Sequence, residues 1–156
     1  MSKNAGNIVL EAKNVVYYYK ANKGKKVLDD ISYGFEIGKM YAILGPSGSG
    51  KTTFLSLLAG LDSPTDGGIY YEGVNIRKKG LHNYRKKNMS LVFQNYNLLP
   101  VLNVYENIVY PIEIDGGKTD TRFVKEIIHT LGLEQKLKNM PNNLSGGQQQ
   151  RVAIAR

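Results

Sequence analysis

The chain has 156 residues and a net charge of +8, from 21 lysines and arginines against 13 aspartates and glutamates. It contains no cysteine, which excludes a disulfide framework and a metal site built from thiolates. No apolar stretch approaches the ~20 residues that span a bilayer, and residues 1–4 lack the apolar core of a signal peptide, so a soluble, cytoplasmic protein is expected.

The first part of the chain favours β-structure. Residues 8–19 are rich in β-branched and aromatic side chains, and apolar and polar residues alternate over residues 30–37, as in a half-buried strand. A polar stretch, residues 20–26, separates them. We expect a small antiparallel layer here. The apolar run at residues 40–44 then predicts a buried strand, and leucines at helical spacing over residues 54–61 predict a helix with one buried face.

Residues 45–52, between that strand and that helix, fit the pattern G-x-x-x-x-G-K-[ST] without a gap. Glycines let the backbone curl around phosphate oxygens, and the N–H groups of a helix N-terminus carry about half a positive charge. Lys51 supplies a full charge for the β- and γ-phosphates, and Thr52 offers a hydroxyl to Mg²⁺. Strand, loop and helix together predict a nucleotide site.

Turn-forming residues follow at 62–68, and residues 69–71 predict another strand. A short basic helix is expected at residues 81–87. Residues 89–93 form a second candidate for a buried strand, which ends at Gln94. A polar side chain at the end of a strand beside a phosphate site is placed to reach a metal ion or a water molecule.

From Asn95 the pattern is helical. Apolar residues over 124–131 recur at i, i+3, i+4 and i+7, and Gly132 is placed to end that helix. His129 lies off this apolar stripe; both it and His82 are expected to be exposed, and we assign neither a role. Near the end of the chain, Ser145 precedes two glycines and is suited to cap a helix, either as an ordinary surface helix or as a second anion site.

The basic residues gather around residues 20–26, 77–79 and 85–87. Such clusters are compatible with nucleic-acid binding, with attraction to anionic lipid head groups, or with solvated loops and helix faces. We favour the solvated surface, because no aromatic residues alternate with these clusters as a stacking platform requires.

Several motifs together resemble the ATP-binding cassette (ABC) transporter ATPases along almost the whole chain. A P-loop followed by Leu-Ser-Gly-Gly-Gln at residues 144–148 is a highly specific combination, and residues 92–94 look like the family's Q-loop entrance. Residues 45–53, 93–100 and 144–156 look most like the lipoprotein-release, macrolide-export and peptide-resistance branch.

The resemblance implies an α/β fold: a P-loop NTPase (RecA-like) core with an N-terminal antiparallel β layer and an α-helical subdomain. The 156 residues would form a single, partial ABC ATPase domain. Residues 1 to about 94 would hold the β layer and the P-loop core, and residues from about 95 to 156 the helical subdomain that ends in the signature helix.

The resemblance also implies ATP and Mg²⁺ as cofactors. Lys51 and Gln94 would act in catalysis, and Thr52 and Gln94 would contact the metal. Tyr19 would stack on adenine. The nucleotide would also contact the residues of the loop, Gly45, Pro46, Ser47, Gly48, Ser49, Gly50, Lys51, Thr52 and Thr53. A second subunit would cover it in trans with its signature, Ser145, Gly146, Gly147 and Gln148, with Ser145 and Gly147 on the γ-phosphate.

The function implied is that of the ATP-binding subunit of an ABC transporter, which couples hydrolysis to transport by a membrane permease. Two such subunits would pair head to tail as a homodimer, peripheral on the cytoplasmic face of the cell membrane, with no nucleic acid expected. One alternative is a soluble ABC ATPase acting on nucleic acid or ribosomes, although Lys51 and Ser145 are too close in sequence to enclose the long coiled-coil insertion of repair-type members. The other is a nucleotide-binding fragment without hydrolysis.

One departure from the family is large. The family continues past the signature helix with a Walker B strand that ends in Asp-Glu, a D-loop and a switch histidine, whereas this sequence ends at Arg156. Residues 109–115 end in an acid but contain Pro111 and Glu113, which disfavour a buried central strand, and they precede the signature. We therefore expect a cassette truncated after the signature motif, without its catalytic glutamate and with little or no turnover alone.

Overall fold

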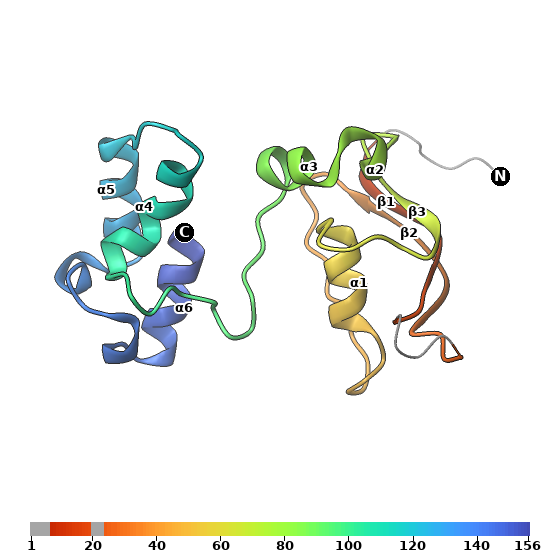
Figure 1. The fold of residues 1–156 in the computed structure, drawn as a ribbon, viewed down its shortest axis with the longest axis horizontal. Coiled ribbons are helices and arrows are strands. Elements are labelled where there is room, and N and C mark those ends of the chain that lie inside the picture. The colour runs from red at the N-terminus through yellow and green to blue at the C-terminus, as the bar shows by residue number, and fades with distance from the viewer. Residues whose placement is uncertain (1–6, 20–23) are drawn as a thin grey trace. The chain divides into compact units, whose positions relative to one another are not determined.

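The structure, a computed structural model, describes residues 7–19 and 24–156. The polar stretch at residues 20–26 therefore lies partly outside the described residues, and residues 1–4 lie wholly outside them. The chain divides into two compact units, Met1–Leu91 and Val92–Arg156 (Figure 1). Each unit has its own cluster of buried apolar side chains. The predicted subdomain boundary near residue 94 stays a prediction.

The first unit is built on a four-stranded antiparallel sheet with the order β2-β1-β3-β4. Its strands are β1 (Ile8–Tyr17), β2 (Leu28–Glu36), β3 (Asp66–Tyr71) and β4 (Val74–Asn75). The predicted antiparallel layer is confirmed, because β1 pairs with β2 along most of its length. The alternation in β2 buries only some of its apolar side chains: Ile31 is 36% and Tyr33 is 52% exposed. Leu28 is buried, and Phe35 packs against the buried cluster.

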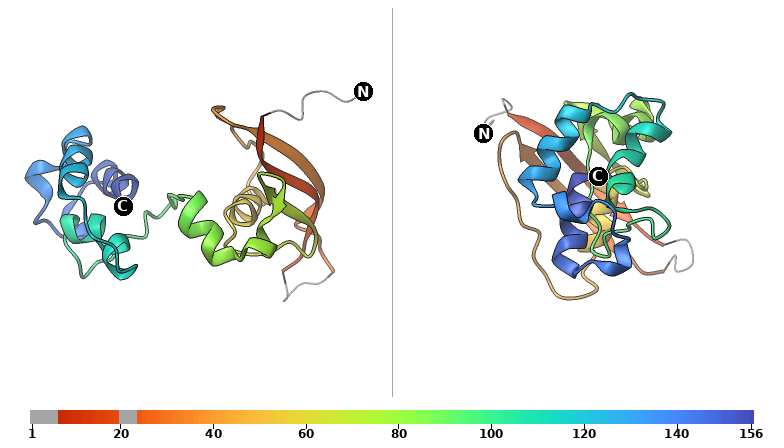
Figure 2. Two further views of the ribbon diagram at one scale, coloured as in Figure 1. Left: turned by 90° about the horizontal axis from the view of Figure 1, so that it is seen from above. Right: turned by 90° about the vertical axis from the view of Figure 1, so that its left-hand side faces the viewer.

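Three helices accompany this sheet: α1 (Lys51–Leu58), α2 (Ile76–Lys79) and α3 (Leu81–Asn88), which confirms the helix after the loop and the short basic helix. Helix α1 lies beside the sheet (Figure 2). Its Leu57 is fully buried in the cluster that also holds Val15 of β1 and Ile69 of β3. Tyr84 of α3 joins that cluster and donates a 2.9 Å hydrogen bond to the carbonyl of Leu58. Burial raises the pKa of this phenol to about 12.

The two buried strands predicted at residues 40–44 and 89–93 are not formed, and this corrects the sequence-based expectation. Met40 is 99% and Leu44 is 87% exposed, and Phe93 is 41% exposed. An extended segment becomes a strand only when its N–H and C=O groups pair with a neighbouring strand. The sheet of the described residues includes neither segment.

The second unit is helical, as expected from Asn95 onward. It contains α4 (Val104–Ile114), α5 (Thr121–Thr130), α6 (Gly146–Ala155) and two short 3-10 turns, η2 (Glu134–Lys136) and η3 (Pro141–Asn143). Val104, Val124 and Val152, one from each α-helix, meet in its buried cluster. Pro111 lies inside α4, so residues 109–114, which the sequence disfavours as a buried strand, are helical.

Both histidines are exposed, as predicted. His129 nevertheless has a partner that the sequence did not reveal, because its Nδ1 lies 2.7 Å from Oε1 of Glu134. A backbone hydrogen bond at Glu134 and the contact with His129 lower the pKa of that carboxyl.

None of the helices in residues 7–19 and 24–156 is both long enough and apolar enough to span a bilayer.

Candidate nucleotide-binding site

The loop before α1 depends on glycine at two positions. Gly48 has φ +80° and Gly50 has φ +88°, a backbone conformation that side chains disfavour. A Cβ at Gly50 would also lie 2.9 Å from the carbonyl oxygen of Val27. Gly50 is the N-cap of α1 and makes no side-chain cap, so the N–H groups of the first helical turn remain available to an anion.

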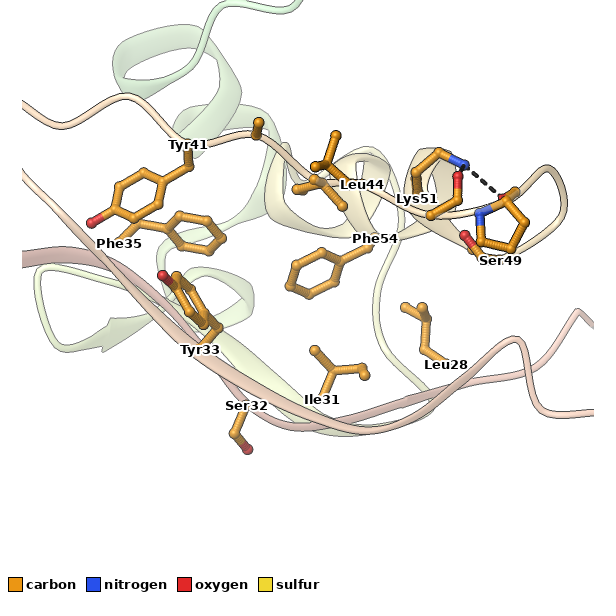
Figure 3. Close-up of a pocket in the computed structure, with 15 residues that line it drawn as sticks. Leu28, Ile31, Ser32, Tyr33, Phe35, Tyr41, Leu44, Ser49, Lys51 and Phe54 are labelled. Carbon is orange, nitrogen blue, oxygen red and sulfur yellow. Dashed lines mark hydrogen bonds between the residues drawn. The ribbon is translucent and has the colours of Figure 1, made fainter.

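Lys51 folds back over this loop. Its ammonium donates hydrogen bonds to the carbonyl oxygens of Gly45, at 2.9 Å, and Pro46, at 2.8 Å (Figure 3). These acceptors are neutral, whereas a phosphate oxygen carries negative charge and attracts the ammonium by a direct charge–charge interaction as well. Phosphate oxygens are therefore able to replace these carbonyls as the partners of the ammonium.

A pocket of about 540 Å³ lies beside the loop, between β2 and the segment at residues 41–46. Aromatic rings cluster in it: Phe35 lies 5.1 Å from both Tyr33 and Tyr41, measured between ring centroids (Figure 3). Among the described residues that line the pocket, Lys51 carries the only charge, and none is a carboxylate. The pocket therefore offers one cation at the edge of an apolar surface.

Tyr19 lies against the helix that follows the loop. Its hydroxyl is 2.8 Å from Oγ1 of Thr53, and 51% of its surface is exposed. Thr53 is nearly buried, whereas the adjacent Thr52 is exposed in the first turn of α1. The structure thus brings Tyr19 and the loop together across 34 positions of sequence.

Two residues beside Tyr19 were missed by the sequence analysis. The hydroxyl of Tyr17 donates a 2.5 Å hydrogen bond to Oδ2 of Asp62, which follows α1. This hydrogen bond and burial raise the pKa of Tyr17 to about 12. The run of three tyrosines at residues 17–19 could have drawn attention to Tyr17. No local pattern, however, indicates that Tyr17 contacts Asp62, which lies 45 positions away.

The signature motif begins a helix in the second unit. Ser145 caps α6 through a reciprocal pair of hydrogen bonds: its hydroxyl accepts from the Gln148 N–H at 3.4 Å, and its own N–H donates to the Gln148 side chain at 3.0 Å. Leu144 is buried, while Gly146 and Gly147 are exposed. The predicted serine-capped helix is confirmed, with its first turn at the surface.

We expect Ser145→Ala to loosen α6. Loss of an N-cap hydroxyl costs about 1 kcal/mol, whereas glycine at the same position costs only about 0.3 kcal/mol. Amides of α6 should therefore exchange about fivefold faster in Ser145→Ala, as measured by native-state hydrogen exchange, and Ser145→Gly should stay close to wild type. Equal rates in all three proteins would show that the capping pair contributes nothing.

The predicted site residues fall in both units. Tyr19 and residues 45–53 belong to Met1–Leu91, while Gln94 and residues 145–148 belong to Val92–Arg156. Gln94 is exposed in a turn at the start of the second unit. The contacts of the described residues join Tyr19 to α1 within the first unit and Ser145 to Gln148 within the second.

Comparison with known proteins identifies the family. Residues 28–156 match the family model for ABC transporters. The chain belongs to the ABC transporter ATP-binding family. This match covers the loop, Gln94 and the signature motif, so the predicted resemblance is confirmed.

Individual relatives of this cassette agree with that assignment. YclH of Bacillus subtilis (strain 168), an uncharacterized ABC transporter ATP-binding protein, is 43% identical over 151 residues, which cover 95% of this chain and 66% of YclH. LolD of Rickettsia bellii (strain RML369-C), a lipoprotein-releasing system ATP-binding protein, is 40% identical over 96% of this chain and 68% of LolD. The cassette thus spans about two thirds of the length of these relatives.

Solved structures confirm the fold class. The dimeric structure of the bacterial ABC transporter cassette MJ0796 matches with a TM-score of 0.81 and 34% identity, covering 94% of this chain and 67% of MJ0796. A dimeric post-hydrolysis state of MJ0796 bound to ADP and Pi matches with the same TM-score of 0.81. The cassette is therefore an α/β P-loop NTPase fold with an antiparallel sheet and helices.

Proposed function

We propose that this chain is the ATP-binding part of an ABC transporter subunit, which couples the binding and hydrolysis of Mg-ATP to transport by a membrane permease. The observation that carries the proposal is the geometry of the loop before α1. An uncapped helix N-terminus, glycines at positive φ and a lysine that donates to neutral carbonyls form a cradle for a polyphosphate.

Each residue of the cradle has a distinct role. The N–H groups at the start of α1 bind phosphate oxygens, and Lys51 moves from the carbonyls of Gly45 and Pro46 to the β- and γ-phosphates. The exposed Thr52 hydroxyl is a hard oxygen ligand of the kind Mg²⁺ prefers, and Thr52 would hold the metal beside the loop. The amide oxygen of Gln94 is a ligand of the same kind. Mg²⁺, when bound, neutralises charge on the phosphates. Tyr19 stacks on the adenine.

The signature motif serves the nucleotide of a second subunit. The exposed first turn of α6 presents N–H groups to an anion, and the Ser145 hydroxyl, which accepts from Gln148, keeps its own proton for the γ-phosphate. Ser145, Gly146, Gly147 and Gln148 thus act in trans in a head-to-tail homodimer. The dimeric state of the related cassette MJ0796 supports this arrangement.

The subunit works at the cytoplasmic face of the cell membrane, bound to its permease. Its likeness to LolD favours the lipoprotein-release branch over a soluble ATPase that acts on nucleic acid or ribosomes. Part of the basic charge serves the fold, because Arg85 donates to the carbonyl of Gly60 and Lys79 lies over the ring of Tyr71.

Calorimetric titration of the full-length protein tests the nucleotide site. Mg-ATP should bind saturably, one molecule per chain, and much more tightly than Mg-AMP, because the cradle contacts the β- and γ-phosphates that AMP lacks. Equal affinity for ATP and AMP, or no binding of either, would overturn the proposal.

The 156 residues alone should release phosphate from ATP no faster than their Lys51→Ala variant. Phosphoryl transfer needs a group that orients the attacking water, and no carboxylate lines the pocket beside Lys51 within the described residues. A phosphate-release assay on the two proteins, purified in parallel, makes the comparison. Steady release that disappears in Lys51→Ala would contradict this expectation.

A further inference from the structure

A line of contacts joins the turn after α1 to Tyr19. The Tyr17 hydroxyl donates to Oδ2 of Asp62 at 2.5 Å, and the Tyr17 ring meets the Tyr19 ring at 90°, with centroids 5.2 Å apart. The Tyr19 hydroxyl in turn lies 2.8 Å from Oγ1 of Thr53. Thr53 is in the first turn of α1, and Asp62 follows the end of that helix. Each of the two tyrosines therefore has a hydrogen-bond partner near one end of α1.

The Tyr19 ring is open to solvent, whereas the two side chains in contact with it are nearly buried. Tyr17 is 8% and Thr53 is 9% exposed, whereas Tyr19 is 51% exposed. Tyr17 and Thr53, which are nearly buried, therefore hold the Tyr19 side chain, about half of which remains exposed to solvent. A side chain that is already ordered loses less conformational freedom when a ligand stacks on it, and this raises affinity without a new contact.

The turn that carries Asp62 has its own attachments to the end of β1. The N–H of Thr65 donates to the carbonyl of Val16 at 2.9 Å, and the hydroxyl of Thr65 accepts from the N–H of Tyr18 at 3.2 Å. These hydrogen bonds do not involve the Tyr17 hydroxyl. Removing that hydroxyl should therefore leave the turn in place and change only the support of the ring.

We propose that Tyr17 and Asp62 are positioning residues that fix the ring of Tyr19 for stacking on the base of the bound nucleotide. The inference rests on the proposed function, because it takes Tyr19 as the residue that contacts the base. Neither Tyr17 nor Asp62 lines the pocket beside Lys51. The pair therefore affects the contribution of the base to affinity and leaves the binding of the phosphates unchanged.

Comparing two ligands separates these contributions. In the full-length protein, Tyr17→Phe should weaken ATP binding by about threefold. The effect is smaller than the free energy of a whole hydrogen bond, because only the ordering of the Tyr19 ring is lost on binding. The affinity for inorganic tripolyphosphate should change by less than about twofold. Asp62→Asn keeps the shape of the acceptor but removes its charge, and should act in the same direction. The matched control is Tyr18→Phe, which deletes the same hydroxyl from the next residue and should change neither affinity.

Other outcomes separate this inference from the proposed function. Unchanged ATP affinity in Tyr17→Phe, or an equal loss for ATP and tripolyphosphate, would overturn the positioning role while ATP binding by the wild type still stands. Wild-type protein that binds ATP no more tightly than tripolyphosphate would exclude a base contact at Tyr19, and with it this inference. Failure to bind either ligand would overturn the nucleotide site itself.

Discussion

Lys51→Ala should weaken Mg-ATP binding by roughly tenfold to a hundredfold. A hydrogen bond to a charged group contributes about 1.5–3 kcal/mol, and ~1.4 kcal/mol corresponds to a factor of ten in affinity. In the structure the ammonium of Lys51 donates to the carbonyls of Gly45 and Pro46, so alanine removes the charge together with these two hydrogen bonds, while the N–H groups of the loop and of α1 remain. Calorimetric titration of wild type and variant measures the difference.

Lys39→Ala is the matched control for this measurement. It removes the same charge from an exposed position that precedes the loop, so it reports any general attraction between the basic chain and a triphosphate. We expect its affinity to stay within about twofold of wild type at physiological salt. An equal loss in both variants would mean that net charge, and not the cradle, attracts the nucleotide.

Gly67→Ala should be the most destabilising substitution considered for the first unit, lowering the free energy of unfolding by roughly 3–5 kcal/mol. Gly67 lies in β3 with φ +74°, where an L side chain is strained. Its Cβ would also fall well inside contact distance of the backbone carbonyls of Lys13 and Asn14. Because these atoms belong to the paired strand β1, they move only if the sheet opens.

Gly73→Ala is the matched variant that introduces the backbone strain without the clash. Gly73 has the same φ of +74°, but nothing lies within 4 Å of the position of its Cβ. We expect it to cost about 1–2 kcal/mol, the penalty of a left-handed conformation alone. Urea unfolding followed by circular dichroism compares the three proteins; similar midpoints for the two variants would show that β1 yields to the added methyl group.

Local features of the site were predictable from the sequence because each depends on residues close together in the chain. Glycines at positive φ before α1 and the capping pair of Ser145 and Gln148 need only a few neighbouring residues to form. The role of Tyr19 was predicted through the family resemblance and stays a prediction; the structure shows its hydroxyl beside Thr53 of α1. The roles of Gln94 and of the signature in trans stay predictions, since they concern residues of different units or subunits.

Several local elements of this protein were predictable from the amino-acid pattern: the strands β1 and β2, the loop and α1, and the helices α5 and α6. Local pattern suffices for these because hydrophobic periodicity, glycine and capping residues act over a few positions. Strand pairing depends on the whole fold: Met40 and Leu44 stay exposed in an unpaired segment, because an apolar run becomes a buried strand only when another strand lies beside it. The tertiary structure also decided that Asp62 meets Tyr17 across 45 positions, a contact that depends on how the turn after α1 packs on the end of β1.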